Sequence, residues 1–454
     1  MSIQSPATAG LVPRLQALAA AIQGRDRRTL LTAATAVAAR LTMLLVTLAT
    51  VRISIGYLGA GRYGLWATIT SLTAFLAFSD LGIGNAIIGR MSSAFASGER
   101  ASASQEVASA TVLLVAIGMA LLVVAVLLLP IVPWPRVYNV SGLAASEAGP
   151  ATLALVACLA VLIPIGLVQK VQLGFQQGAI ANLWAIAGAL LGLVLLVIGI
   201  DLRLGLPWLV LAVAGGPVAA TALNWVQEFF FLRPWLRPRP DRADHRSAVG
   251  LARTGALFLG LQVAAAVAFS SDNFIAAQLL GPVAVAQYSV TQRVYFVLPA
   301  LLSGAAVALW PAYGEAIHIG DRKWIRRMLV RSTVLAVGVT AVGSLAILAS
   351  SNLVFGFLIG STLVPSLALG LGFVVWSMLY AFGNVASMLL NAAHVLVFQL
   401  ATAFLMAASS VALKIELGHA FGVAGIIWGM VIAYAIFSLM PTLIYLRHRR
   451  RVDW

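Results

Sequence analysis

The sequence predicts an all-α polytopic membrane protein with 12 transmembrane helices, arranged as two six-helix bundles. Apolar stretches long enough to cross a bilayer alternate with short polar links, and the arginines gather in every second link. The composition agrees, since 61% of the 454 residues are hydrophobic and only 9% are charged. Soluble domains carry about 25% charged residues. A water-soluble globular protein is therefore excluded.

Each predicted span has at least the roughly 20 residues needed to cross about 30 Å of hydrocarbon. The first apolar run is a full span, and we expect no cleavable signal peptide before it. In chain order the spans are expected at residues 29–51, 64–89, 107–129, 150–169, 180–200, 206–231, 253–276, 288–311, 332–358, 363–391, 395–416 and 421–446.

The basic residues predict the orientation. Of the 29 Lys and Arg residues, five lie in links expected to face outward, two lie inside spans, and the other 22 lie in the opposite links and the two tails. Because cytoplasmic links retain Lys and Arg, the N- and C-termini are predicted to be cytoplasmic. The five residues expected in outer links are Arg52, Arg62, Arg136, Arg203 and Lys414.

The net charge of +15 does not indicate a nucleic-acid partner, because retention signals and anionic membrane lipids account for basic cytoplasmic links. The single cysteine, Cys158, excludes a disulfide framework, and the five scattered histidines give no metal-ligand spacing. No phosphate-binding glycine motif is present, so direct use of ATP is not expected. We predict no metal, no cofactor and no catalytic residue.

The polar stretch from Arg233 to Arg253, with three prolines and six arginines, divides the chain between spans six and seven. Apolar residues at helical spacing before it, near the N-terminus, predict an amphipathic helix on the cytoplasmic membrane face. The predicted units are a cytoplasmic amphipathic N-terminus (1–28), an N-terminal six-helix bundle (29–232), a basic cytoplasmic linker (233–252), a C-terminal six-helix bundle (253–446) and a basic cytoplasmic tail (447–454).

Two short anchors recur at one spacing and suggest that the bundles are duplicates. Leu-Gly ends at Gly59 and again at Gly281, and Gly-acid-Arg begins at Gly98 and again at Gly320, an offset of 222 residues in both cases. Six spans return the chain to its starting side, so the two copies would be parallel repeats around a central cavity. Such an arrangement is typical of alternating-access transporters.

Charges inside the spans are the candidate site residues, because a charge at mid-bilayer costs about 2.5–3.5 kcal/mol on insertion scales. Arg40 lies near the middle of the first span, Arg293 one to two turns into the eighth, and Arg52 at the outer end of the first. Facing the cavity, these arginines would bind an anion such as phosphate or pyrophosphate. The alternatives are pairing with a buried acid or, for Arg52 and Arg293, reaching outward to the membrane interface.

Two carboxylates, Asp80 in the second span and Asp272 in the seventh, are candidates for coupling to protons or cations. The alternative is that they cap helix ends or hold glycine-rich turns. Asn384 in span ten and the glutamines after span four, Gln176 among them, are candidates for contact with sugar hydroxyls. Such amides also hold helices together.

Two patches carry more specific information. The first reads GYLGAGRYGLW at 56–66, followed by SDLGIGN at 79–85, and the second is Asp272-Asn273 before Leu280-Gly281 and Tyr288-Ser289-Val290. They resemble the Wzx-type polysaccharide-biosynthesis flippases, which belong to the superfamily of multidrug, oligosaccharidyl-lipid and polysaccharide exporters. Span count and halves extend that resemblance over the whole chain.

The resemblance implies a multi-pass protein of the bacterial inner membrane. It implies that the chain flips a polyprenyl-pyrophosphate-linked oligosaccharide by alternating access, for exopolysaccharide or O-antigen synthesis. An H+ or Na+ gradient is the expected energy source. A polysaccharide polymerase and chain-length machinery are the expected partners. The predicted 12 spans depart from lipid II flippases, which have additional C-terminal ones.

Two other functions stay open at this point. A multidrug or cation antiporter of the same superfamily is the nearest, although it would favour acids and aromatic residues over arginines in its cavity. A membrane-embedded polysaccharide enzyme is less favoured, because the only longer outer link, residues 130–149, carries Arg136 and Glu147 alone as charged residues. We therefore predict a transporter and not an enzyme.

Overall fold

The computed structural model describes residues 11–71, 76–138, 140–359 and 365–449, and nearly all of them are helical. In chain order the helices are α1 (Leu11–Ser71), α2 (Leu76–Ser79), α3 (Ile83–Ser97), α4 (Arg100–Leu128), α5 (Trp134–Val137), α6 (Leu143–Ile165), α7 (Leu167–Gly174), α8 (Gly178–Asp201), α9 (Leu206–Val226), η2 (Gln227–Leu232), η3 (Pro234–Leu236), η4 (Pro240–Arg242), α10 (His245–Leu280), α11 (Pro282–Ala306), α12 (Leu309–His318), α13 (Arg322–Ala349), α14 (Ser351–Ile359), α15 (Leu367–Ala392), α16 (Leu396–Phe421), α17 (Val423–Tyr434), η6 (Ala435–Leu439) and α18 (Met440–Arg449).

Within these ranges, 11 helical segments are long and apolar enough to cross a membrane, and they correspond to all the predicted spans except the second. The second, expected at 64–89, is discontinuous. Leu81 (φ 49°) and Gly82 (φ 76°) have positive φ there, which ends a right-handed helix. Residues 72–75 of this span lie outside the described residues. The part of the chain that the structure describes thus contains 11 long apolar helices, and the break at Leu81 and Gly82 lies between α2 and α3.

Helix α1 differs from the prediction at its outer end. The expected polar link between the first two spans is helical, with Gly59 (φ 70°, ψ 170°) as the one non-helical residue inside α1. Residues 11–28 continue into the first span within the same helix. Their placement at the membrane surface stays a prediction.

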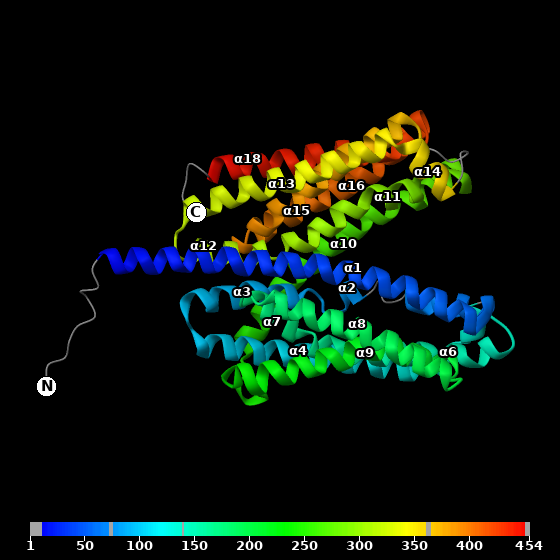
Figure 1. Ribbon diagram of the computed structural model, residues 1–454, viewed down its shortest axis with the longest axis horizontal. Coiled ribbons are helices and arrows are strands. Elements are labelled where there is room, and N and C mark those ends of the chain that lie inside the picture. The colour runs from blue at the N-terminus through cyan, green and yellow to red at the C-terminus, as the bar shows by residue number, and fades with distance from the viewer. Residues whose placement is uncertain (1–10, 72–75, 139, 360–364, 450–454) are drawn as a thin grey trace.

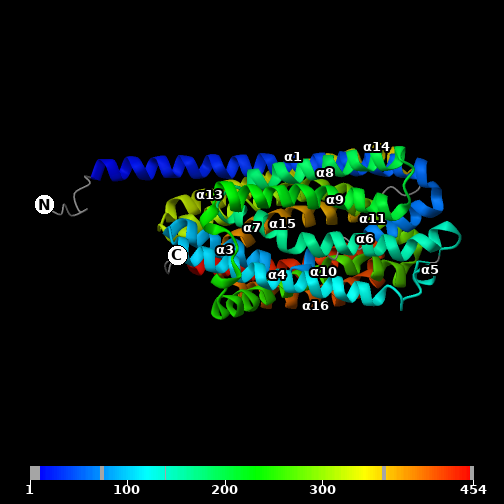
Figure 2. The same ribbon diagram turned by 90° about the horizontal axis from the view of Figure 1, so that it is seen from below.

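The helices form two groups (Figure 1). Helices α3 to α9 lie on one side and α10 to α18 on the other, with α1 along the boundary between them. Helix α1 runs alongside α8 of its own half (Figure 2) and also contacts α11 of the other half. Helix α1 therefore contacts both halves of the molecule along the boundary between them.

The buried apolar residues show where the halves meet. One core contains residues of both halves, among them Ile87 and Met91 of α3 with Trp310 and Tyr313 of α12. The two other cores each belong to one half. The halves are thus joined around α3 and α12, which we call the closed end, and have separate cores toward the opposite end.

The backbone supports the predicted duplication. Gly59 and Gly281 have φ of 70° and 84°, and Gly98 and Gly320 have φ of 74° and 73°. Positive φ is readily adopted by glycine and strained for other residues. Both sequence anchors therefore contain a glycine with positive φ in both halves, at the same offset.

Candidate functional site

A cavity of about 800 Å³ lies between α1 and the second half. Helix α1 forms one wall, and α10, α11, α15 and α17 form the other. The cavity is lined by Arg40, Leu41, Met43, Leu44, Thr47, Leu48, Phe269, Asp272, Gln292, Arg293, Phe296, Val297, Ala300, Leu301, Trp376, Tyr380 and Met430. Three of the six predicted site residues, Arg40, Arg293 and Asp272, are thus brought together.

The two cavity arginines keep their charge accessible. Both Arg40 and Arg293 are exposed, and no hydrogen bond or ion pair is found for either guanidinium within the described ranges. Arginine stays protonated at any physiological pH and presents five donors. The cavity therefore offers two permanent positive charges with free donors, the arrangement that an anion requires.

Asp272 is the one acid that lines this cavity, and it is paired. Its carboxylate forms an ion pair with Lys414 of α16, a side chain with no exposed surface. The prediction that Lys414 lies in an outer link is wrong, because the residue is buried inside α16. Its position near the end of a span left the two placements indistinguishable by hydropathy. Lys414 is the main site residue that the sequence reasoning missed.

Further contacts hold this ion pair. The Tyr288 hydroxyl donates to Asp272 Oδ2 at 2.7 Å and the Gln292 amide donates to the same oxygen at 3.4 Å. Lys414 also donates to the Ala268 carbonyl and to Ser271 Oγ, the latter at 3.3 Å. A buried ion pair needs such additional hydrogen bonds to offset its desolvation.

Aromatic side chains line the cavity beside the charges. Phe296 and Tyr380 have ring centroids 4.7 Å apart, and Phe269 lies 5.6 Å from Trp376. Trp376 and Tyr380 complete the cluster at 6.0 Å. The cavity therefore has a cationic part and an apolar aromatic part, which suits an amphiphile.

Asp80 lies outside this cavity, at the break in the second predicted span. Its carboxylate oxygens accept from the backbone N–H groups of Gly82 and Gly84 at 2.9 and 3.2 Å. A Cβ on Gly82 would lie 2.2 Å from the carbonyl oxygen of Gly255 on α10. The geometry thus favours the alternative that Asp80 holds a glycine turn, one that packs against the other half.

Arg52 and Asn384 are not brought to the cavity either. Arg52 follows Arg40, Leu44 and Leu48 at i+4 spacing on α1, so it shares their face one turn beyond the lining. The amide of Asn384 donates to the Tyr380 carbonyl of its own helix at 2.9 Å. Their predicted roles in substrate binding stay predictions.

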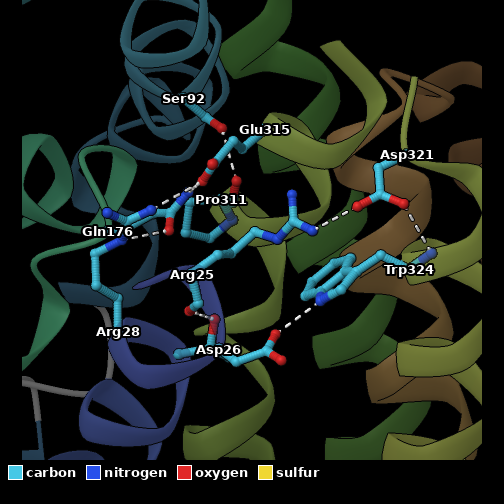
Figure 3. A network of polar contacts seen from close by, with 10 residues as sticks. Arg25, Asp26, Arg28, Ser92, Gln176, Pro311, Glu315, Asp321 and Trp324 are labelled. Carbon is cyan, nitrogen blue, oxygen red and sulfur yellow. Dashed lines mark hydrogen bonds and ion pairs between the residues drawn. The ribbon is translucent and has the colours of Figure 1, made fainter. Parts of the chain in front are cut away.

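A polar network ties the halves together at the closed end (Figure 3). Arg25 of α1 pairs with Asp321 at 2.9 Å, and its guanidinium carbon lies 3.9 Å from the Trp324 ring centroid. The indole N–H of Trp324 donates to Asp26 at 2.7 Å. Asp321 also caps α13 by accepting from the backbone N–H of Trp324 at 3.1 Å.

A second part of the network reaches α12 (Figure 3). Arg28 pairs with Glu315 at 3.3 Å and donates to Gln176 at 3.1 Å, while Gln176 itself donates to Glu315. The predicted role of the glutamines in holding helices together is confirmed for Gln176. We call Arg25, Asp26, Arg28, Gln176, Glu315, Asp321 and Trp324 the latch.

The latch and the cavity lie at different levels along α1. Twelve residues separate Arg28 from Arg40, which is about 18 Å at the helical rise. The latch therefore fastens the halves near the N-terminal end of the first span, and the cavity lies farther along α1. Among the residues that the structure describes, no group of three or more His, Cys, Asp or Glu side chains is placed to hold a metal ion.

Known proteins agree with this architecture. The sequence profile of the polysaccharide biosynthesis protein family matches residues 28–317, well over half of the chain. The chain belongs to this family. The resemblance to the Wzx-type polysaccharide-biosynthesis proteins is thereby confirmed, and the apolar helices of the described ranges support a multi-pass membrane protein. No curated protein sequence matches the chain.

Solved structures share the fold. The MATE transporter VcmN from Vibrio cholerae in its bent form is 16% identical, with a TM-score of 0.79 over 94% of this chain and 98% of that one. A multidrug-resistance MATE transporter of the MOP superfamily in its outward-facing conformation is 16% identical, with a TM-score of 0.77 over 94% and 97%. A MOP-superfamily transporter from Pyrococcus furiosus with a binding pocket of reverse polarity is 15% identical, with a TM-score of 0.76 over 94% and 96%. Identities this low establish the fold alone.

Proposed function

We propose that this protein is a flippase that moves a polyprenyl-pyrophosphate-linked oligosaccharide across the bacterial inner membrane. One observation carries the proposal: Arg40 and Arg293 line one cavity, and no residue of the described ranges forms a hydrogen bond or ion pair with either guanidinium. A pyrophosphate has charge and acceptor oxygens that match planar arginine forks. The proposed activity is transport and not catalysis.

The pairing of Asp272 strengthens this reading. Lys414 neutralises the single acid of the lining, so the two arginines determine the sign of the cavity. At effective dielectric constants near 20, charges about 4 Å apart interact by about 4 kcal/mol. An organic cation would therefore meet repulsion where an anionic headgroup meets attraction.

The aromatic part of the cavity supports an amphiphilic substrate. Phe269, Phe296 and Trp376 present apolar rings beside the arginines. We propose that the rings contact the first isoprene units while the arginines hold the pyrophosphate. The sugars would extend toward the open side of the cavity, and the remaining lipid chain would stay in the bilayer.

Alternating access completes the mechanism. We propose that the interrupted segment at 64–89 is a twelfth crossing, that the chain forms two six-helix bundles and that both termini are cytoplasmic. The latch would then close the cytoplasmic side, and the present conformation would be open to the outside. Asp272 is the proposed coupling residue for a proton or cation gradient. A polysaccharide polymerase and chain-length machinery are the proposed partners that receive the product.

Reconstituted protein tests this function. Proteoliposomes would be loaded with a fluorescent polyprenyl-pyrophosphate oligosaccharide, and an enzyme that acts on the sugar would report its arrival in the opposite leaflet. We expect the wild type to flip the lipid. Arg40→Gln should reduce the flipping rate roughly tenfold to hundredfold, because it removes one charge-assisted contact. Arg40→Lys keeps the positive charge but lacks the planar guanidinium, so its flipping rate should lie between those of the wild type and Arg40→Gln. Flipping that is unchanged in both variants would contradict the proposal.

A multidrug transporter is the second candidate, favoured by the aromatic cluster around Tyr380 and by the shared fold. Rings of this kind attract planar cations. The same vesicles distinguish the two functions. Transport of ethidium with no transport of the pyrophosphate lipid would favour this second candidate, despite the arginines.

A further inference from the structure

Lys414 occupies the position at Asp272 that a bound cation would take. Its ammonium contacts the Asp272 carboxylate, the Ala268 carbonyl and Ser271 Oγ. A lysine ammonium has three N–H donors, and here three oxygens face it. The side chain is fully buried, so its ammonium group is held at this place by the chain.

The other carboxylate oxygen of Asp272 is engaged as well. Tyr288 and Gln292 both donate to Oδ2. A hard cation such as sodium needs several oxygen ligands at once. With Lys414 in place, the oxygens that would form such a shell are already used by its ammonium.

We propose that Lys414 is a tethered cation that replaces sodium at Asp272, so that this site excludes sodium and responds to protons. In the proposed step one proton adds to the Asp272 carboxylate and later leaves it, and no other covalent bond forms or breaks. The coupling role of Asp272 rests on the proposed function. The exclusion of sodium by Lys414 rests only on the contacts described above.

Charged and titratable groups of several helices lie at Asp272 or line the same cavity. Lys414 from α16 and Tyr288 from α11 contact its carboxylate. Arg293 from α11, Tyr380 from α15 and Arg40 from α1 line the same cavity. Helix α17 contributes Met430 to the lining and Tyr434 to the same core. Protonation of Asp272 would leave Lys414 uncompensated among these cations. An anion in the cavity and a proton on Asp272 therefore favour each other, because linkage is reciprocal.

Sodium binding tests the occupancy without any lipid substrate. Radioactive sodium would be measured on the full-length protein in nanodiscs at pH 7.5. We expect no saturable binding by the wild type and new binding by Lys414→Ala, which frees three oxygens. The double variant Asp272→Asn with Lys414→Ala should not bind. Lys170→Ala removes a lysine of a different pocket and serves as the matched control.

Flipping tests the coupling and needs only the wild type. In proteoliposomes with the fluorescent polyprenyl-pyrophosphate probe, a pH gradient should change the flipping rate and a sodium gradient should not. Sodium binding by the wild type that Asp272→Asn abolishes would overturn the inference. Flipping that follows a sodium gradient, or neither gradient, would also overturn it. Failure of the probe to bind would contradict the proposed function and leave the sodium-binding result unaffected.

Discussion

The guanidinium of Arg40 on α1 lies directly against Gly304 on α11, in space that a side chain at position 304 would fill. A Cβ built on Gly304 would come within 2.5 Å of Arg40 Nε and 3.3 Å of Cδ. Helices α1 and α11 belong to opposite halves of the molecule. The absence of a side chain at Gly304 thus provides the space that the Arg40 guanidinium occupies.

Gly304→Ala should therefore displace Arg40 from the cavity wall. We expect binding of a polyprenyl pyrophosphate to weaken roughly tenfold, the loss of about one charge-assisted contact. The thermal stability should be kept or rise, because alanine is favoured over glycine in a helix by about 1 kcal/mol. Microscale thermophoresis in detergent would measure the affinity.

Gly338→Ala on α13 is the matched control, since a Cβ there meets nothing within 4 Å. Its lipid affinity should equal that of the wild type. Equal affinity in Gly304→Ala as well would show that Arg40 does not act from this position.

The Asp272–Lys414 pair should set the electrostatic balance of the cavity. Lys414→Met leaves the Asp272 charge without its partner, so affinity for pyrophosphate lipid should fall roughly tenfold at pH 7.5. Adding Asp272→Asn removes the uncompensated charge and should restore most of the affinity. Isothermal titration would complete the double-mutant cycle. Additive losses in the double variant would contradict a coupled pair.

The latch should hold the halves in the present conformation. Asp321→Asn removes the partner of the fully buried Arg25 at a cost of about 1–3 kcal/mol, which should shift the population toward an opening at the closed end. Cys158 is the only cysteine of the chain. Spin labels would therefore be attached at Ser97→Cys on α3 and Ile319→Cys after α12, in a Cys158→Ser background. Double electron–electron resonance would measure the distance between the two labels, which increases when this end opens.

In Asp321→Asn we expect a second population of molecules with a longer distance between the labels, which the wild type lacks. Asp241→Asn, at an exposed acid outside the latch, should leave the distances unchanged. Exchanging the charges as Arg25→Asp with Asp321→Arg should recover the short distance in part. A single short distance in Asp321→Asn would show that the latch does not govern the conformation.

His394, in the turn between α15 and α16, should give the fold a small dependence on pH. Loss of water around the imidazole, which lies against Gly89, lowers the pKa of His394 from its usual 6.5, and the Arg90 charge lowers it further. The unfolded chain then binds the proton more readily than the folded one. Stability contributed by the neutral imidazole is therefore present above pH 6.5 and is lost as pH falls below it.

His394→Asn should remove this part of the pH dependence. Asparagine tolerates the positive φ of 55° at this position. Thermal unfolding in detergent between pH 8 and pH 5 would compare the variant with the wild type. Parallel curves for the two proteins would contradict a role for His394.

Much of the fold follows from hydropathy, because a span of lipid-facing residues allows few alternatives to a helix. The second span was the exception. Its residues are apolar enough, but the Asp80 turn and the close approach of Gly82 to Gly255 interrupt the helix. That interruption depends on contact with the other half, which local sequence does not reveal.

The site was predicted where a charge had no other reason to be in the membrane. Arg40, Arg293 and Asp272 stood out for that reason, and they line one cavity. Lys414 was missed because it lies near a span end. Arg25 and Arg28 were missed because retention of basic residues on the cytoplasmic side already accounted for them, although both pair across the halves.

The central claim is that this cavity binds a lipid pyrophosphate through Arg40 and Arg293. Equilibrium binding of a polyprenyl pyrophosphate in nanodiscs tests it most directly, with Arg136→Gln in the exposed helix α5 as control. The account predicts binding to the wild type and the control. It predicts a loss of at least about a hundredfold in the double variant Arg40→Gln with Arg293→Gln. Equal affinity in all three proteins would contradict the claim.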